Sequence, residues 1–435
     1  MKEEGTGLQV YKFGGASVKD AAAILNLCRI VRDFGPSGPL LIVVSAMGKT
    51  TNALEEIFNL AASEQDWDDA VQMLRQYHQQ IIDILSQKLP TFDKVAVAAA
   101  LDDQLRLLDA ELLRAGLEPD YEEHYDQIVS LGEQISVQIV IAALAGALSK
   151  EAVHHLAAPL VLRTDASWRE GKVNWLETSN LVQQAVNQAV AVGEKVIVTE
   201  GFIGGTADGR TTTLGREGSD YSAAIFAYCL NAASVTIWKD VPGLLNADPK
   251  IFPDTVLYPE ISYQETIEMA FYGASVIHPK TLKPLADRHI PLRVKSFLDP
   301  GAPGTLIHDC QHPPLVPAFI RKGGQCLLSF ESKDFAFISE ENLEVIFGAL
   351  AQARLKINLM QNSAISFSVC TDYNEMRVQR LLGLLQGQFR VQYNSELTLF
   401  TIKHYDAASV ERLTNGRTLL LEQRTRSTFQ FLVRE

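Results

Sequence analysis

The sequence predicts an α/β protein in two parts, a three-layer αβα domain around a mostly parallel sheet and a smaller α+β region after it. Three observations support this prediction. Short apolar, β-branched runs alternate with helical patterns over the first three hundred residues. A proline-rich stretch then interrupts the chain, and the order of strands and helices changes after it. The length of 435 residues exceeds what one hydrophobic core usually serves, so more than one domain is expected.

The parallel sheet is predicted from five short runs that are apolar along most of their length. Such runs are typical of parallel strands, because helices bury these strands on both faces. The runs are LQVYKF (8–13), LLIVV (40–44), KVIVT (195–199), SVTIW (234–238) and PLRVK (291–295). Between them apolar residues recur at helical spacing, first at Ile24, Leu27, Cys28 and Val31 and later between Val182 and Val190. Ligands of such sheets bind beyond the carboxyl ends of the strands, so the residues that follow each strand are the candidates for function.

Two segments depart from this alternation. Residues 53–118 are rich in Leu, Gln, Asp and Glu at helical spacing and predict a helical insertion, to which we assign no chemistry. Near DCQHPPLVPAF (309–319) the prolines exclude regular structure and predict a boundary. The two predicted parts are therefore residues 1–312 and 313–435.

The second part predicts a ferredoxin-like region. Between CLLSF and FRVQY its elements follow the order β-α-β-β-α-β, which is that of a split β-α-β unit. Ser339 is placed to cap the first helix, with Asn342 three residues later. A second unit begins at LTLFTIKHY, but the sequence reaches Glu435 before a second helix and a fourth strand. We therefore expect this second unit to be truncated.

Composition argues against several classes of function. The chain has 39 Lys and Arg against 52 Asp and Glu, a formal net charge of −13, which argues against nucleic acid or an anionic membrane as the main partner. No segment approaches eighteen consecutive apolar residues, so we expect a soluble, cytoplasmic protein. Five cysteines lie without C-x-x-C spacing, and we predict neither a disulfide framework nor a metal site. Four histidines lie in predicted loops without acidic partners nearby, and we interpret them as ordinary surface or core residues: His154, His155, His308 and His312.

Glycine-rich loops follow two of the predicted strands. In KFGGASV (12–18), Gly14 and Gly15 let the backbone approach an anion closely, while Lys12 adds positive charge. A helix that starts at Asp20 would turn its N–H groups toward the same point, and together these features predict phosphate binding. The loop GRTTTLGREGSDYS (209–222) fits two interpretations equally, a surface turn or an anion site before a helix.

Three further segments carry polar residues that each allow two interpretations. SAMGKTTNA (45–53) is no Walker loop, because Val43 stands where the first glycine is required, and its hydroxyl groups either contact a small ligand or cap a helix. Glu133 opens an apolar helix, where a glutamate is commonly a capping or dipole residue. KDVPGLLNADPK (239–250) is either a solvated loop or a nucleotide contact.

No Ser/His/Asp, Cys/His or His/Glu arrangement has a credible catalytic spacing in the sequence. Phosphoryl transfer needs little covalent chemistry from the protein, chiefly positioning and neutralisation of phosphate charge. A carboxylate acceptor is already ionised at neutral pH and needs no general base. The residues present are therefore compatible with phosphorylation of a carboxylate.

Seven motifs together resemble the aspartate kinases of the amino-acid kinase family, in the same order and spacing over about residues 8–308. They are KFGGASV, VVSAMGKTTN, SLGEQIS, GFIGGTADGRTTTLGREGSDYSAA, WKDVPGLLNADPK, FYGASVIHPKTL and PGTLI. The resemblance implies the amino-acid kinase fold for residues 1–312, L-aspartate as acceptor, ATP with Mg²⁺ as co-substrate and no tightly bound cofactor. It implies 4-phospho-L-aspartate as product, on the way to lysine, threonine and methionine. Residues 313–435 are similar to ACT domains, which implies a homodimer through this region and an effector such as lysine or threonine.

The resemblance also implies a role for each matching residue. Lys12 matches the lysine that neutralises the transferred phosphoryl group, and Asp220 matches the aspartate that orients this lysine. Arg216 matches the arginine that binds the α-carboxylate of the substrate, and Glu133 the glutamate that receives its α-ammonium group. Further substrate contacts are implied at Ser45, Thr51, Gly218 and Ser219. ATP contacts are implied at Lys12, Gly14, Gly15, Lys239, Asp240, Leu245, Lys250 and Ser275. Glu217 matches no assigned role.

Three positions depart from the family pattern. Ser275 stands where many members have a lysine near the nucleotide phosphates, Leu245 replaces an often aromatic residue, and Lys239 replaces a common threonine. Either Lys280 or Lys239 could offset the lost lysine. Effector pockets of ACT domains lie between paired units, so a truncated second unit implies that such a pocket could be lost.

Two other functions stay open beside aspartate kinase. One is an amino-acid sensor with an inactive kinase domain. The other is a kinase of a different carboxylate, such as glutamate or N-acetylglutamate. Arg216 and Glu133 argue against an N-acylated substrate, because acylation removes the ammonium group.

Overall fold

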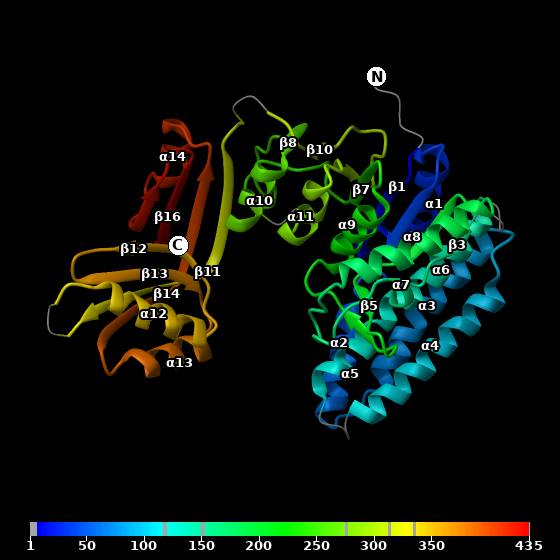
Figure 1. Cartoon of the computed structure of the whole chain (residues 1–435), viewed down its shortest axis with the longest axis horizontal. Coiled ribbons are helices and arrows are strands. Elements are labelled where there is room, and N and C mark those ends of the chain that lie inside the picture. Colours follow the sequence, from blue (N-terminus) through cyan, green and yellow to red (C-terminus); the bar gives the residue numbers. More distant parts are fainter. Residues whose placement is uncertain are drawn as a thin grey trace. The chain divides into compact units, whose positions relative to one another are not determined.

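The computed structural model describes residues 7–115, 120–148, 153–274, 277–311, 315–333 and 336–434. These residues fold into two compact units (Figure 1). The first unit lies within Met1–Leu244, Leu257–Ile267 and Val276–Gln311, and the second within Leu245–Val256, Glu268–Ser275 and His312–Glu435. The second unit therefore takes in two short segments that come before the predicted boundary.

The first unit is built on an eight-stranded sheet with the order β3-β4-β2-β1-β7-β9-β10-β8. Its five central strands are the five apolar runs, and they pair in parallel as predicted. β10 pairs antiparallel with β9, and β8 pairs parallel with β10, so these two strands run against the central ones. The strands are β1 (Gln9–Phe13), β2 (Leu40–Val44), β3 (Val153–His155), β4 (Val196–Glu200), β7 (Ser234–Lys239), β8 (Glu260–Ser262), β9 (Leu292–Ser296) and β10 (Thr305–His308).

Helices cover both faces of this sheet, as the predicted three-layer architecture requires. On one face α6 (Leu131–Ala147) packs against β2, β3 and β4 and contacts α1 (Ala21–Phe34). On the other face α9 (Gly218–Leu230) packs against β1, β2 and β7 and contacts α8 (Trp175–Ala191) and α11 (Pro279–Asp287). These helices bury the central part of the sheet on both sides, which explains why β2 and β4 are buried along their whole length.

Three helices lie in the segment for which we predicted a helical insertion, and they pack against one another, against α5 (Tyr121–Val129) and against α6. The stretch Tyr121–Ala147 is long and apolar enough to cross a membrane by length and composition, but 72% of its apolar window is buried inside the protein. A helix that is apolar all round is typical of a protein core. The remaining elements of this unit are α2 (Thr50–Ala62), α3 (Asp68–Lys88), α4 (Lys94–Ala115), α5 (Tyr121–Val129), α7 (Ala158–Val161) and the strand pair β5 (Ile203–Gly205) and β6 (Thr211–Thr213).

The second unit contains a six-stranded antiparallel sheet with the order β12-β13-β11-β14-β16-β15. The predicted β-α-β-β-α-β order is that of β11, α12, β12, β13, α13 and β14. Ser339 caps α12 as predicted: its Oγ accepts the N–H of Asn342, and Oδ1 of Asn342 accepts the N–H of Ser339. The elements are β11 (Ala318–Ser332), α12 (Glu340–Gln352), β12 (Ile357–Asn362), β13 (Ser366–Asp372), α13 (Glu375–Leu385), β14 (Phe389–Lys403), α14 (Ala407–Thr414), β15 (Leu419–Arg424) and β16 (Thr428–Arg434).

Two long strands, β11 and β14, each run through both halves of this second sheet. Their pairing register shifts near Gln325, which divides each strand into two arms. The half that contains α14 has four strands, namely residues 318–322 of β11, residues 397–403 of β14, β16 and β15. One of these strands therefore comes earlier in the chain than the β12–α13 segment. The predicted truncation of this second unit did not count that strand.

Parts of the predicted nucleotide loop pack within the second unit. The N–H of Phe319 donates to the carbonyl oxygen of Asn246 at 2.7 Å, and the rings of Phe319 and Phe252 lie 5.6 Å apart. The buried side chain of Lys403 forms an ion pair with Glu268 of α10 (Tyr263–Tyr272). The segments 245–256 and 268–274 are thus held by the strands of the second sheet.

Candidate active site

Three neighbouring strands end together at one edge of the first sheet. β1 lies between β2 and β7, and both pairings are parallel, so the three strands end at the same edge. Lys12 lies near the end of β1, Ser45 follows β2, and Lys239 ends β7. The first turn of α9 brings Asp220 to the same place. This is the edge at which parallel sheets usually bind their ligands.

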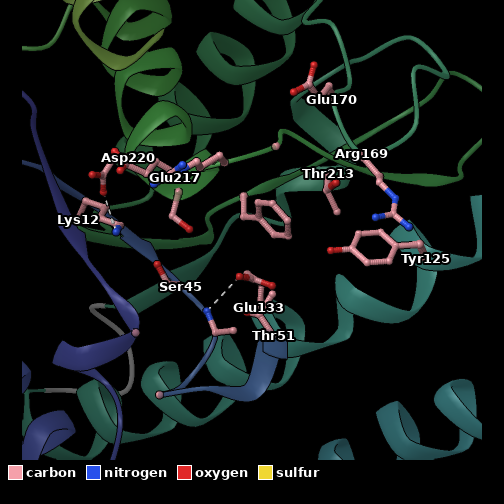
Figure 2. Close-up of a pocket in the computed structure, with 18 of the residues that line it drawn as sticks. Lys12, Ser45, Thr51, Tyr125, Glu133, Arg169, Glu170, Thr213, Glu217 and Asp220 are labelled. Carbon is pink, nitrogen blue, oxygen red and sulfur yellow. Dashed lines mark hydrogen bonds and ion pairs between the residues drawn. The ribbon is translucent and has the colours of Figure 1, made fainter. Parts of the chain in front are cut away.

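A cavity of about 580 Å³ lies at this edge (Figure 2). It is lined by ten of the predicted site residues, which are Lys12, Gly15, Ser45, Thr51, Glu133, Arg216, Gly218, Ser219, Asp220 and Lys239. In Figure 2, Lys12 and Asp220 lie at one end, Tyr125 and Arg169 lie at the other, and Glu133 lies between them. Every residue predicted for catalysis or for substrate binding therefore lines one cavity.

At one end of the cavity a single carboxylate holds two ammonium groups. Oδ1 of Asp220 lies 2.7 Å from Nζ of Lys12, and Oδ2 lies 3.3 Å from Nζ of Lys239. Asp220 is only 3% exposed. Burial acts to raise the pKa of Asp220, but the charges of the two lysines outweigh it and hold this pKa below its usual value. This end thus combines two cations with one anion and carries a net positive charge.

In the middle of the cavity a second buried carboxylate has no cation beside it. Glu133 is 2% exposed, and its Oε1 accepts the N–H of Ala46 at 3.1 Å. Its Oε2 is buried and has no hydrogen-bond partner among the described residues. Burial raises the pKa of Glu133 to about 8, although the N–H of Ala46 and the charge of Lys12 act to lower it. Glu133 is therefore suited to receive a cation from a ligand.

The loop before α9 supplies a guanidinium group that has no partner in the described part of the chain. Arg216 is exposed, lines the cavity and makes no ion pair or hydrogen bond there through its side chain. The next residue, Glu217, has a left-handed backbone with φ of +54°, a conformation uncommon outside glycine and asparagine. Oε2 of Glu217 is buried without a hydrogen-bond partner among the described residues. Strain and an unpaired carboxylate in one residue are typical of a functional loop.

The two glycines after β1 have different surroundings. A Cβ atom on Gly15 would lie 3.0 Å from the carbonyl oxygens of Ala46 and Gly48, so a larger residue there would require the loops after β1 and β2 to move slightly apart. A Cβ atom on Gly14 would lie 3.3 Å from Nζ of Lys12. The N-terminus of α1, predicted to face an anion, is capped by Asp20, whose carboxylate accepts the N–H of Ala23. The first turns of α2, α6 and α9 line the cavity, through Thr51, Glu133 and Gly218 respectively.

The far end of the cavity holds residues that the sequence analysis did not find. The guanidinium of Arg169 lies 3.7 Å from the centre of the Tyr125 ring, close enough for a cation–π contact. The buried Asp126 accepts the N–H groups of Arg169 and Thr213 and the hydroxyl of Thr213. Thr213 belongs to the loop GRTTTLGREGSDYS, but no local motif marks Tyr125, Asp126 or Arg169, because these residues meet through packing of α5 against β6 and the segment before α8. Glu170 and Phe202 also line this cavity.

Five predicted nucleotide contacts do not line the cavity or fall outside the described residues. Gly14 and Asp240 belong to the first unit but are not part of the lining. Leu245 and Lys250 belong to the second unit. Ser275 lies outside the described residues. Of the two lysines considered as replacements for the family lysine, Lys239 lies in the cavity, whereas Lys280 lines a different one together with Trp175, Tyr221 and Tyr228.

The prediction that the histidines have no acidic partners is wrong for three of them. His154 and His155 lie in β3, 2.7 Å from Glu194 and Glu200 respectively. His308 contacts Glu260 of the neighbouring strand. These partners are distant in sequence and meet through strand pairing, which sequence spacing does not show. His312 lies outside the described residues.

The sequence is similar to one protein family and to several enzymes of known function. The model of the amino acid kinase family matches residues 7–296. Lysine-sensitive aspartokinase 3 of Escherichia coli is 30% identical over 410 residues, which cover 90% of this chain and 86% of that protein. The aspartokinase of Chlamydia pneumoniae is 30% identical, with 86% and 80% covered. A bifunctional aspartokinase/homoserine dehydrogenase of Zea mays is also 30% identical, but the chain spans only 41% of its length.

Solved structures agree with the sequence comparison. The crystal structure of E. coli aspartokinase III in complex with aspartate and ADP has a TM-score of 0.82 at 28% identity, with 98% of this chain and 96% of that chain covered. The same enzyme in complex with lysine and aspartate has a TM-score of 0.78 over the same shares. Both compact units of this chain therefore have counterparts in one solved enzyme. The chain belongs to the amino acid kinase family and, within it, to the aspartokinases.

Proposed function

We propose that the chain catalyses transfer of the γ-phosphoryl group of ATP to the β-carboxylate of L-aspartate, which gives 4-phospho-L-aspartate and ADP. This is the first step toward lysine, threonine and methionine. The observation that supports it best is the division of one cavity into an end with two cations and a region with an unpaired buried carboxylate, while the exposed guanidinium of Arg216 also lines the cavity. Membership of the aspartokinases supports the same conclusion.

The substrate is selected by opposite charges at two positions. Arg216 binds the α-carboxylate, since a guanidinium can donate two parallel hydrogen bonds to it. Glu133 receives the α-ammonium group, which supplies the cation that its Oε2 lacks. Thr51, Ser45, Gly218 and Ser219 line the space around the bound amino acid. With both ends of the zwitterion held, the β-carboxylate is directed toward the lysines.

The lysines act on the phosphates. An oxygen of the β-carboxylate attacks the γ-phosphorus, the bond from this phosphorus to the β,γ-bridging oxygen breaks, and ADP leaves. Lys12 neutralises charge on the transferred group, and Asp220 fixes the position of its Nζ. Lys239 shares Asp220 and supplies a second positive charge near the phosphates. ATP brings Mg²⁺ as its counter-ion, and Gly14, Gly15, Asp240, Leu245, Lys250 and Ser275 complete the proposed nucleotide contacts.

A hydroxamate assay tests this proposal, because hydroxylamine traps the acyl phosphate that the reaction forms. Aspartate, glutamate and N-acetylglutamate are compared at equal concentrations with ATP and Mg²⁺. We expect product with aspartate and little with the other two. Product chiefly with glutamate or N-acetylglutamate would overturn the choice of substrate. Calorimetric binding of aspartate without any turnover would support an amino-acid sensor instead.

We further propose that the enzyme is a cytoplasmic homodimer that pairs through its second unit and responds to an amino-acid effector, lysine or threonine. The second sheet supports this proposal, because it leaves apolar side chains exposed, among them Met360, Ile365 and Leu420. The complex of E. coli aspartokinase III with lysine supports a lysine effector. Light scattering gives the oligomeric state, and the same assay with added lysine or threonine tests the effector. A monomer, or full activity at high concentrations of both amino acids, would contradict the corresponding part.

A further inference from the structure

Three metal-ligating side chains lie together at the edge of the first sheet that is opposite to the active site. β10 runs against the central strands, and its Ile307 pairs with Leu292, the first residue of β9. β10 therefore ends where β9 begins, whereas the active site lies where β1, β2 and β7 end. His308 is the last residue of β10, and Cys310 follows it by two residues. Glu260 is the first residue of the adjacent β8.

Strand geometry explains why these side chains meet. Glu260 pairs with Leu306 in the parallel β8–β10 ladder, and side chains alternate along a strand, so Glu260 and His308 project from the same face. Asp309 contacts His289 instead. The nearest ligand atoms of Glu260, His308 and Cys310 all lie within 4.8 Å of one another. They offer one carboxylate oxygen, one imidazole nitrogen and one sulfur.

This set of donors matches the coordination chemistry of zinc. Zn²⁺ binds His nitrogen, carboxylate oxygen and Cys sulfur at about 2.0–2.3 Å, so the ligands of a tetrahedral site lie about 3.3–3.8 Å apart. His308 and Glu260 contact each other directly, so a bound ion would separate these two side chains and take the place of their ion pair. The side chains of His308 and Glu260 are 30% and 50% exposed, so an ion can enter from solvent. Cys310 is the one cysteine of the five that is not buried.

We propose that Glu260, His308 and Cys310 form a binding site for a thiophilic divalent transition ion such as Zn²⁺, separate from the active site. Three protein ligands leave the fourth position to water. The bound ion ties Cys310 to β8, and Cys310 lies one residue before Gln311, where the first unit ends. The ion therefore stabilises the end of the first unit and takes no part in phosphoryl transfer.

Cobalt is the probe that tests this site, because a Co²⁺–thiolate bond gives a charge-transfer absorption band that carboxylate and imidazole ligands do not give. Full-length protein without an affinity tag is freed of metal by chelation and titrated with Co²⁺ in the absence of ATP. We expect one equivalent to bind with this band. Cys310→Ser abolishes the band, and His308→Gln weakens Co²⁺ binding at least tenfold. His289→Gln is the matched control, since His289 contacts Asp309 beside the site, and we expect it to keep both the band and the affinity.

A stability measurement accompanies the titration. Zn²⁺ raises the Tm of the wild type and leaves the Tm of Cys310→Ser unchanged, while both proteins keep equal phosphotransferase activity. A wild type without the thiolate band, or a band that survives in Cys310→Ser, overturns the proposal. So does a wild-type Tm that does not respond to Zn²⁺. If Cys310→Ser does not fold, the affinity of His308→Gln decides the question in the same way.

Discussion

The two carboxylates of the cavity have almost the same burial but opposite electrostatics. Asp220 and Glu133 are 3% and 2% exposed, so burial acts to raise the pKa of both. Two lysines lie beside Asp220 and hold its pKa below the usual value, whereas Glu133 has no such partner and its pKa rises to about 8. The difference arises from which cations the chain itself supplies. The carboxylate of Asp220 is paired with cations before any ligand binds, whereas the carboxylate of Glu133 is expected to receive its cation from the substrate.

The largest effect is expected at the end of the cavity that contains Asp220. Lys12→Ala removes a charge that acts on the transferred phosphoryl group, and we expect kcat to fall a hundredfold or more. Steady-state kinetics with ATP and aspartate measure this loss. Lys94→Ala is the control, because Lys94 is exposed on α4 in an ion pair with Asp83. If kcat of Lys12→Ala stays within a few-fold of the wild type, the assigned role of Lys12 is wrong.

A smaller effect is expected where the ligand supplies the partner. Arg216→Ala removes a contact that is present before the transition state, so we expect KM for aspartate to rise about 30-fold while kcat changes little. Arg210→Ala is the matched control, because Arg210 lies in the same connection but is paired with Glu123 and Asp208. An unchanged KM in Arg216→Ala would remove Arg216 from the substrate site.

Lys239 tests how much the second cation beside Asp220 contributes to catalysis. It forms the longer of the two ion pairs with Asp220, so Lys239→Met leaves Lys12 as the cation paired with Asp220. We expect kcat to fall about tenfold, less than for Lys12→Ala, together with a higher KM for ATP. KM for aspartate should change by less than twofold. A rise confined to KM for aspartate would place Lys239 with the substrate and contradict its role at the phosphates.

The last prediction concerns stability and its dependence on pH. The folded pKa of Glu133, about 8, lies above the value of about 4.5 in an unfolded chain, so the folded state binds more protons between these two pH values. The free energy of unfolding of the ligand-free enzyme therefore falls as pH rises through this window, with at most about 1.4 kcal/mol per pH unit from this one group. Asp220 adds no slope there, because its pKa lies below the window.

Glu133→Gln isolates that contribution. The difference in unfolding free energy between this variant and the wild type, measured by urea denaturation from pH 5 to pH 8, should grow with pH in favour of the variant. A difference that does not depend on pH would show that Glu133 is already ionised in the empty cavity. Aspartate binding to the wild type at pH 6.5 should also release a proton, which calorimetry in buffers of different ionisation enthalpy detects.

Much of the first unit could be predicted from sequence, because its information is local. Five apolar runs fixed the central strands, and short motifs after them marked Lys12, Ser45 and Asp220. The motif after β1 indicated a close backbone approach at Gly15. The structure shows that the approaching segment is the loop after β2, which the motif alone could not identify. The motifs of this chain mark residues near strand ends, such as Lys12 and Ser45, and residues in the first turns of helices, such as Glu133 and Asp220.

Contacts between distant segments could not be predicted in this way. Arg169 reaches the cavity through its contact with Tyr125 in α5, and no local pattern indicates that pairing. The segment 245–256 overlaps the loop predicted after β7, yet it packs with the second unit. The pairs of His155 with Glu200 and of His308 with Glu260 likewise depend on strand pairing. In each case tertiary packing determines which residues are in contact, and the spacing of residues in the sequence does not indicate these contacts.

The shared strands β11 and β14 determine how the second unit divides into modules. Residues 318–322 and 397–434 form one four-stranded module. The segment between these two ranges is an insertion within that module. The register shift near Gln325 marks the junction. A deletion of the inserted segment would leave every strand of the four-stranded module in the chain. The four-stranded module therefore takes none of its strands from the inserted segment.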